Sequence, residues 1–362
     1  MQITFLVGNG FDLSAGINTS YNGFYEWYIS QPSKSAAIER FKREIDNYMK
    51  IEDPDLRKES CWADFEIALG EYTKEFTKDT ADDFLNVYED AHEGLGTYLE
   101  KECAKFDTNI TDPATITNIR DGILNFYQEL TPQEKGLFSQ IFANDKGNNS
   151  QIKFISFNFT DSLDSIVKHL CKAPLSTWQH NGSRTLSVLP SVLHVHGTTQ
   201  HLPIVGVFDE SQVANKALLS YPGIAPVMIK LQSIQTIGEL WYNEAEKQID
   251  SSQIICIWGM SLGATDAFWW QKLVSWLRSD GTHQLIIFWY SARSISQRSI
   301  LARVQMKNEV ISRLTAYSGL NASEINLISD RIHVVVNTKS VLHVSFPLIV
   351  KEKNIESNSQ DT

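Results

Sequence analysis

ITFLVGNG, residues 3–10, is the stretch that decides the fold of this chain. Five mostly apolar residues, Ile3–Val7, predict a short strand that is covered on both faces. The glycines that follow permit a sharp turn and a close approach of backbone amides to a phosphate, whose charge the next helix N-terminus favours. The stretch therefore predicts the first strand and ligand loop of a nucleotide-binding α/β domain of the Rossmann type.

The loop departs from the strict dinucleotide fingerprint, because its third glycine, Gly16, stands six residues after Gly10. A tight strand-to-helix turn without a ligand is the alternative explanation. Asp12 lies where a side chain caps the next helix or contacts a ribose. The cofactor-binding residues expected here are Gly8, Asn9, Gly10, Asp12 and Gly16.

Further short apolar runs predict the rest of a parallel sheet with helices on both faces. They are Ile152–Phe157, Val192–Val195, Ile254–Trp258, Leu285–Trp289 and Ile332–Val336, with Pro203–Val207 as a candidate seventh strand.

The long interval between the first two strands reads as helix. Ser35–Met49 and Ala81–Lys101 are amphipathic, and Thr131-Pro132 is typical of a helix start. We expect an α/β domain over residues 1–350, interrupted by a helical insertion at 29–149, and a disordered polar tail at 351–362. The insertion could act as a lid or as a homo-oligomer surface, and no sequence feature decides between the two.

Composition narrows the function classes. Hydrophobic residues make up 42% and charged residues 21%, as in globular enzymes. The net charge of -11 argues against a broad nucleic-acid footprint. No apolar run is long enough to span a bilayer, and the N-terminus does not resemble a signal peptide. Four scattered cysteines predict neither disulfides nor a zinc site, so we expect a cytoplasmic protein without a membrane partner.

The segment FISFNFTDSLD, residues 154–164, places polar side chains after a buried strand. Asn158 stands at the strand end, where ligands of open α/β sheets bind, and its amide can hold a ribose hydroxyl or a water. A strand-end turn residue is the alternative. Thr160 and Asp161 are helix-cap candidates.

The segment VLHVHGTTQ, residues 192–200, ends another strand with a histidine and a glycine. His194 is expected to pack inside the strand, whereas Gly197 leaves His196 free for proton transfer near neutral pH. The His-x-His pair could also suggest a metal, but no third ligand has a suitable spacing.

Gly259-Met260-Ser261-Leu262-Gly263 matches the nucleophile elbow of α/β-hydrolases. That alternative would need an acid and a histidine downstream, for which the candidates are Asp330 with His333 or His343. Otherwise Gly259 and Ser261 form a second small-residue turn beside a nucleotide, and Asp266 caps the following helix.

The order of these motifs resembles that of sirtuin-like NAD-binding proteins. The resemblance implies a glycine loop for the dinucleotide at Gly8, Gly10 and Gly16, and a catalytic pair at Asn158 and His196. It also implies a nucleotide turn at Gly259 and Ser261. Apart from the resemblance, Asp161 and Asp266 are expected as further nucleotide contacts.

The sequence departs from sirtuin deacylases at several points. It lacks their paired CxxC zinc motifs, so zinc and deacylation are not expected. Asn18 and Tyr21 replace the proline and arginine after the glycine loop. Thr160 stands where an aspartate is usual, and Asp161 follows it.

The chain resembles the AbiH family of bacterial abortive-infection proteins more closely. The blocks that carry this resemblance are GNGFDLSAGINTSY, WADFE at Trp62–Glu66, FNFTDSLD, HVHG and GMSLGATD. The resemblance implies defence against bacteriophage, with a nucleotide ligand and a phage-derived trigger as partners.

The chemistry expected is cleavage of the nicotinamide–ribose bond of NAD or a related nucleotide. Asn158 would orient the ribose or water, His196 would accept a proton, and amides around Gly8–Gly10 would hold the pyrophosphate. Asp12 or Glu66 would stabilise the ribose cation.

Two other classes stay open on the sequence alone. One is a metal-dependent nuclease or nucleotide hydrolase that uses Asp12, Asp64, Glu66 and Asp161. The other is a binding module that senses a nucleotide or phage protein without chemistry.

Overall fold

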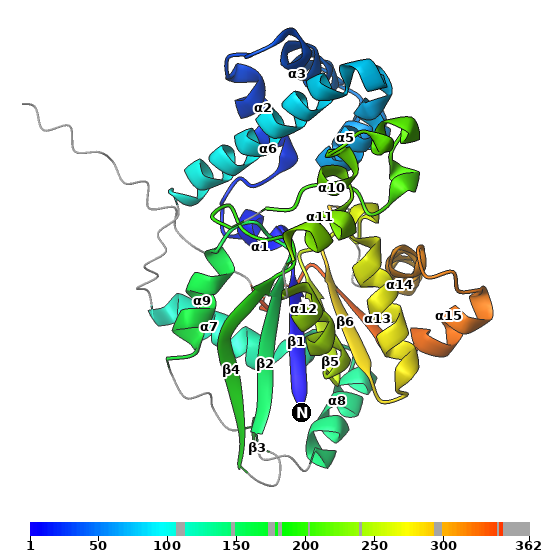
Figure 1. The fold of residues 1–362 in the computed structure, drawn as a ribbon. Helices are drawn as coiled ribbons and strands as arrows, with labels where there is room; N and C mark the ends of the chain where they lie inside the picture. The colour runs from blue at the N-terminus through cyan, green and yellow to red at the C-terminus, as the bar shows by residue number, and fades with distance from the viewer. Residues whose placement is uncertain are drawn as a thin grey trace, which may run out of the picture.

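A parallel sheet forms the centre of the molecule (Figure 1). The structure is a computed structural model, and it describes residues 1–105, 113–145, 149–172, 178–179, 183–201, 203–238, 241–292, 299–338 and 340–342. The strands are β1 (Gln2–Val7), β2 (Asn149–Ser156), β3 (Trp178–Gln179), β4 (Ser183–His194), β5 (Ile254–Trp258), β6 (Gln284–Trp289) and β7 (Ile332–Val336). Their spatial order is β3-β4-β2-β1-β5-β6-β7, and every pair is parallel except the two-residue pairing of β3 with β4.

The parallel strands have the order of a Rossmann sheet. Without β3, the central strand β1 is flanked by β2 on one side and by β5 on the other. Val7 at the end of β1 stands opposite Ser156 of β2 and Trp258 of β5. The chain order reverses at β1, and ligands of such sheets bind outside the carboxyl ends of the strands at this point.

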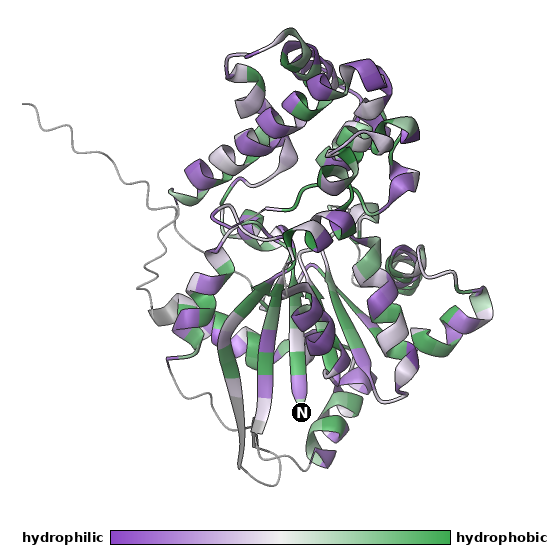
Figure 2. Ribbon diagram, viewed as in Figure 1, coloured by the Kyte–Doolittle hydropathy of each residue, from purple (hydrophilic) through white to green (hydrophobic). Residues whose placement is uncertain are grey.

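Helices cover both faces of the sheet, as the continuous apolar strands predict. Phe5 and Val7 of β1 pack on one face against α7 (Pro113–Leu124), α8 (Pro132–Asn144) and α9 (Ser162–Leu170). Leu6 packs on the other face with α12 (Trp241–Asp250), α13 (Ala267–Ser279), α14 (Ile300–Thr315) and α15 (Ala322–Ser329). Figure 2 shows the apolar residues concentrated along the strands between these two layers.

A separate group of helices stands over the carboxyl ends of the strands, at the top of Figure 1. This group, here called the cap, has its own core and draws on two distant parts of the chain. Its helices are α2 (Tyr21–Ser30), α3 (Ala36–Met49), α4 (Pro54–Glu59), α5 (Phe65–Tyr72), α6 (Ala81–Cys103) and α10 (Ile224–Met228). The helix α11 (Lys230–Ile237) follows α10 but packs its apolar residues Leu231 and Ile234 into the sheet-side core. The helix α1 (Gly10–Ser14) lies between cap and sheet.

Short 3₁₀ helices complete the described elements. They are η1 (Cys61–Ala63), η2 (Thr73–Glu75), η3 (Lys78–Thr80), η4 (Phe126–Glu129), η5 (Glu210–Gln212), η6 (Lys216–Ser220) and η7 (Ala264–Asp266).

The helices between β1 and β2 occupy two places. Those of residues 21–103 form the cap, whereas α7 and α8 lie on the sheet itself. The helix start expected at Thr131 is confirmed, because its hydroxyl accepts from the N–H of Glu134, whose carboxylate accepts from the N–H of Thr131.

The candidate strand Pro203–Val207 was a wrong prediction. Only Val207 forms a bridge, with Ile229, and the segment pairs with no sheet strand. Its polar groups turn to the cap instead: the carbonyl of Pro203 lies 2.9 Å from His92 Nε2, and the N–H of Gly206 donates to Glu66. The additional strand of the sheet is β3, and β4 begins well before Val192 because it pairs along β2.

Of the helices that the structure describes, none is both long and apolar enough to cross a membrane.

Candidate functional site

A cavity of about 930 Å³ lies at the carboxyl ends of the strands, beneath the cap. Residues that follow β1, β2, β4, β5, β6 and β7 all line it, and the cap closes it from above. The size is that of a pocket for a small organic ligand, and the place is the one that the strand order predicts.

The glycine loop after β1 crosses the loop after β5 in direct contact. The N–H of Gly8 donates to the carbonyl of Trp258 at 2.9 Å, and that of Gly10 to the carbonyl of Gly259 at 2.8 Å. A Cβ on Gly10 would lie 2.6 Å from the Gly259 Cα, and one on Gly8 would lie 2.8 Å from the Gly259 oxygen. Gly259 itself has φ +68°. We call Gly8, Gly10 and Gly259 the glycine crossing, which needs glycine for backbone packing.

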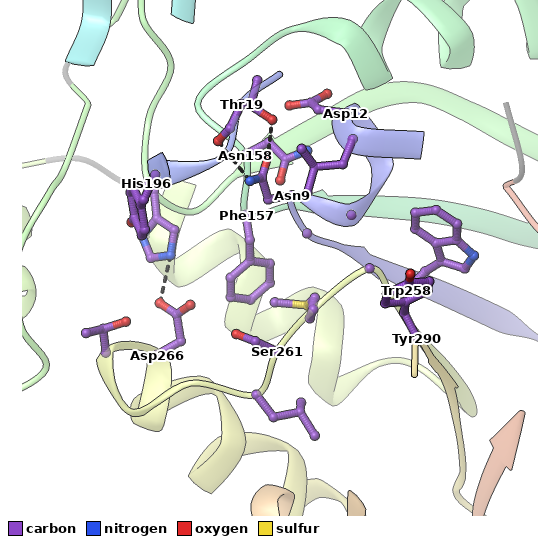
Figure 3. Close-up of a pocket in the computed structure, with 18 of the residues that line it drawn as sticks. Asn9, Asp12, Thr19, Phe157, Asn158, His196, Trp258, Ser261, Asp266 and Tyr290 are labelled. Carbon is purple, nitrogen blue, oxygen red and sulfur yellow. Dashed lines mark hydrogen bonds and ion pairs between the residues drawn. The ribbon is translucent and has the colours of Figure 1, made fainter. Parts of the chain in front are cut away.

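Asn9 and Asp12 are both bonded within the protein. The amide nitrogen of Asn9 donates to the Thr19 carbonyl at 3.0 Å, and its oxygen accepts from the Thr19 hydroxyl (Figure 3). The buried carboxylate of Asp12 accepts from the hydroxyls of Thr160 and Ser162. It caps no helix, so that part of the interpretation was wrong: Asp12 lies inside α1 and ties it to the loop after β2. Burial raises the pKa of Asp12, although the hydroxyl bonds oppose the shift.

Two predicted contacts lie away from the cavity. Gly16 is exposed after α1, where it adopts φ +82°. Asp161 is exposed just before α9, and its side chain makes no cap hydrogen bond. Neither residue lines the cavity.

Asn158 lines the cavity just beyond β2 with an unsatisfied amide. Its side chain is 4% exposed, and within the described residues neither Oδ1 nor Nδ2 has a hydrogen-bond partner. Buried polar groups in native proteins are almost always bonded, so an unbonded one in a cavity wall marks a place where a ligand or water completes the pairing.

His196 stands beyond the neighbouring strand β4 and is equally buried. Its Nε2 lies 2.8 Å from Asp266 Oδ1 (Figure 3), but neither ring nitrogen makes a well-aligned hydrogen bond to any described residue. Burial and the nearby Lys230 lower the pKa of His196, and Asp266 offsets them only in part. The imidazole is therefore neutral near pH 7 and able to accept a proton.

His194, two residues earlier, is fully bonded. Its Nε2 lies 2.8 Å from Asp164 Oδ2, and its Nδ1 lies 3.2 Å from the carbonyl of Asn158. Burial acts to lower the pKa of His194, but the Asp164 carboxylate outweighs it and the net shift is upward. The expectation that His194 packs agrees with these contacts. His196 is not exposed to solvent as the following glycine suggested, because it is buried in the cavity wall.

A buried ionic cluster stands beside His196. Lys230 Nζ lies 2.9 Å from Glu66 Oε2 and 3.0 Å from Asp266 Oδ1. Burial raises the pKa of Glu66 to about 7 although Lys230 opposes it. Burial acts in the same direction on Asp266, but Lys230 and His196 bring the pKa of that carboxyl well below its usual range. The expected cap role of Asp266 was wrong, because its carboxylate makes these contacts and no cap bond.

Lys230 was missed by sequence reasoning. In α11 its buried neighbours Ser233 and Ile234 follow at helical spacing, so the lysine lies on the buried face of a short helix. A lysine on such a face needs a buried partner, and that was the available signal.

The structure does not assemble the serine-hydrolase alternative at Ser261. His333 lies at the amino end of β7, where its ring nitrogens approach Glu134 at 2.8 Å and Gln284 at 2.9 Å. The positive φ of this turn falls on Leu262 (+56°) and Gly259, not on the serine. His343 lies outside the described residues.

The carboxylates of the metal alternative do not gather either. Asp64 caps α5 through the N–H groups of Glu66 and Ile67. Asp12 is held by hydroxyls and Asp161 faces solvent. Among the described residues, no group of three or more His, Cys, Asp or Glu could hold a metal ion.

The far end of the cavity, beyond β5 and β6, is aromatic. Trp258 is buried, and its indole N–H has no acceptor among the described residues. Tyr290 is 78% exposed, and the Arg313 guanidinium lies 5.4 Å from the centre of the Trp289 ring. Such planar rings and a cation suit a heteroaromatic base or an anionic group.

Comparison with known families gives one match. The family described as bacteriophage abortive infection AbiH matches residues 4–288, which is well over half of the 362 residues and reaches from within β1 to within β6. A search among curated proteins found no match.

Proposed function

The chain belongs to the AbiH family of bacteriophage abortive-infection proteins, and we propose that it serves this role by cleaving the nicotinamide–ribose bond of NAD or of a related nucleotide. The observation that carries the proposal is the pair formed by Asn158 and His196. Both stand at the carboxyl ends of adjacent strands, both are buried, and both lack well-aligned hydrogen bonds to described residues.

The place of the pair supports a nucleotide as ligand. The sheet has Rossmann order, and the cavity lies where the order reverses. It extends from Asn158 and His196 past the glycine crossing to the aromatic end at Trp258 and Tyr290. A ligand with a heteroaromatic group at each end would fill this length. The sirtuin-like order of the motifs stays a prediction.

The hydrogen bonds of the glycine crossing change how a pyrophosphate would be bound. The N–H groups of Gly8 and Gly10 already donate to protein carbonyls. They are therefore not the free donors that the sequence suggested. In the proposal the glycines keep the two loops close together, so that the ligand can pass over the crossing.

The reaction needs few protein groups. The bond between the ribose carbon and the nicotinamide nitrogen breaks, and its electron pair leaves with neutral nicotinamide. A water then adds its oxygen to the positively charged ribose carbon and gives up a proton. Asn158, with one free acceptor and free donors, orients the ribose hydroxyls or this water, and neutral His196 accepts the proton.

The ionic cluster supports a positive charge at this end. Near pH 7 Glu66, with its pKa of about 7, adds a partial negative charge to the ionised Asp266, against the single cation of Lys230. The excess negative charge favours both the pyridinium ring of the substrate and the ribose cation that forms from it. Depletion of NAD would halt host and phage together, which is the outcome that abortive infection requires.

The test offers the purified protein NAD, ATP and nucleic acids separately and follows which is consumed. We expect loss of NAD with release of nicotinamide, and at least about 100-fold slower release for Asn158→Ala and His196→Ala. Matched controls are Asn125→Ala and His169→Ala, because both side chains bond to a carbonyl on their own segment and neither lines the cavity.

Other results would point elsewhere. NAD that is bound but stays intact for hours would indicate a sensor. Activity that a chelator abolishes would indicate a metal-dependent hydrolase. Variants of Asn158 and His196 that stay as toxic as wild type, with NAD intact, would overturn the proposal.

A further inference from the structure

Lys230 joins the cap to the sheet inside the cavity. It begins α11, bonds Glu66 of α5 on one side, and bonds Asp266 beyond β5 on the other. Glu66 also accepts from the N–H of Gly206 at 3.0 Å, so the carboxylate is fixed from two directions. The side chains of Lys230 and Glu66 are 8% and 6% exposed, so solvent screens the pair little.

One oxygen connects this bridge to His196. Asp266 Oδ1 lies 3.0 Å from Lys230 Nζ and 2.8 Å from His196 Nε2. The ammonium and the imidazole therefore stand less than about 6 Å apart and compete for the same anion. At that distance a like charge changes the balance between protonated and neutral forms by a factor of about ten or more.

We propose that Lys230 is a positioning residue that holds Asp266 and keeps His196 neutral, and that through Glu66 it makes this state depend on the seating of the cap. The proposal deepens the function proposed above and rests on it for its catalytic meaning. The bridge itself is a property of the folded protein, with or without substrate.

Few other groups near His196 carry a charge that could change its protonation. The rings of Phe157 and Phe159 lie 5.5 and 6.2 Å from the imidazole and carry no charge. The charged groups on the elements packed around the cavity at this end are Asp64 and Glu66 of the cap, Lys230 of α11 and Asp266. Only Lys230 among them opposes protonation of His196.

Cap displacement would then act directly on the histidine. Glu66 belongs to α5 of the cap, whereas Asp266 and His196 follow strands of the sheet, and α11, which carries Lys230, packs Leu231 and Ile234 into the sheet-side core. If the cap lifts, Lys230 loses Glu66 as a partner, and its ammonium is no longer held from the cap side in its place beside Asp266 and His196. A partner that moves the cap would therefore change catalysis without touching the substrate.

The experiment follows the titration of His196 by NMR in full-length protein with labelled histidine, and His196→Gln identifies the resonance. In Lys230→Met we expect the midpoint to move up by about one pH unit or more. Lys230→Arg, which keeps the charge, should stay near wild type. Lys272→Met is the matched control, because Lys272 pairs with Glu246 and Asp250 away from the cavity.

A second variant keeps the test decisive if Lys230→Met does not fold. Lys230→Gln removes the charge but keeps an amide that can donate to Glu66 and Asp266, so the midpoint of His196 should likewise move up. An unchanged midpoint in Lys230→Met or in Lys230→Gln would overturn the proposal.

Activity separates this proposal from the one above. With NAD cleaved, the acid limb of the rate–pH profile should follow the shifted midpoint in Lys230→Met. With no NAD cleaved by any variant, the proposed reaction fails, while the titration still decides the role of Lys230.

Discussion

The glycine crossing and the ends of β2 and β4 form two walls of one cavity, and they differ in how their polar groups are satisfied. At the crossing, the N–H groups of Gly8 and Gly10 bond to carbonyls of the β5 side. At the strand ends, the buried side chains of Asn158 and His196 lack well-aligned partners among the described residues. The motif that identifies the fold is thus a structural joint, and the groups left for a ligand lie on the neighbouring strands.

The largest loss of stability is expected when a side chain is added at the glycine crossing. In Gly10→Ala the new methyl group would meet the Gly259 backbone at 2.6 Å, and neither loop can yield without losing its hydrogen bonds. We expect a loss of about 3 kcal/mol in the free energy of unfolding, or no soluble protein. Urea denaturation measures it.

The control for this variant is another glycine. A Cβ on Gly96, inside α6, would meet nothing within 4 Å, so Gly96→Ala should gain about 0.5–1 kcal/mol. Equal behaviour of the two variants would remove the structural reason for glycine at the crossing.

A smaller effect should appear in the pH dependence of stability at Glu66. Its pKa is raised from 4.5 to about 7 by burial, so between these values the unfolded chain releases a proton that the folded protein retains. The contribution of Glu66 to stability is therefore lost as pH rises through this window. The advantage of wild type over Glu66→Gln should shrink by about 2 kcal/mol from pH 5 to pH 8.

Denaturation of both proteins at the two pH values gives the difference directly. A constant difference would mean that Glu66 titrates near its ordinary pKa in the folded protein.

The smallest effect on stability is expected from replacing Asn158, whose side-chain amide has no hydrogen-bond partner among the described residues. Asn158→Leu replaces it with an apolar side chain of similar size, so the free energy of unfolding should change by no more than about 1 kcal/mol, while NAD cleavage is lost. Asn215→Leu is the comparison, because Asn215 donates to the Phe76 carbonyl at 2.7 Å and its loss leaves that carbonyl unpaired.

Thermal or urea unfolding of both variants makes the comparison. Destabilisation of Asn158→Leu beyond that of Asn215→Leu would show that Asn158 has a structural partner.

Local patterns were enough to predict the sheet and the strand-end residues. Runs such as Ile254–Trp258 are apolar because helices cover both faces of the sheet. Such a run can be recognised from consecutive residues alone. Because the carboxyl ends of parallel strands meet at one edge, Asn158 and His196 could be placed together from the sequence alone.

Contacts between distant segments could not be predicted in the same way. Glu66 and Lys230 stand 164 residues apart, and nothing in either segment specifies the other. The role of Asp266 could not be predicted either. Its position before α13 suggests a helix cap, but its carboxylate contacts Lys230 and His196, which come from distant segments. The glycine crossing differs from these cases. Its glycine motif could be seen in the sequence, but the need for glycine comes from contact with a second loop, which the sequence did not reveal.

The central position of β1 has a consequence for how the protein is made. Ile3 pairs with Ile254, so this apolar strand leaves the ribosome 251 residues before one of its two neighbours. At about 5–20 residues per second, the delay is on the order of 12–50 seconds. Pairings so distant along the chain also fold slowly. The cavity needs Asn337 and Thr338 for its wall, so a growing chain carries no complete site until Thr338 has been translated. An abortive-infection protein assembled in this order has no complete site during most of its own synthesis.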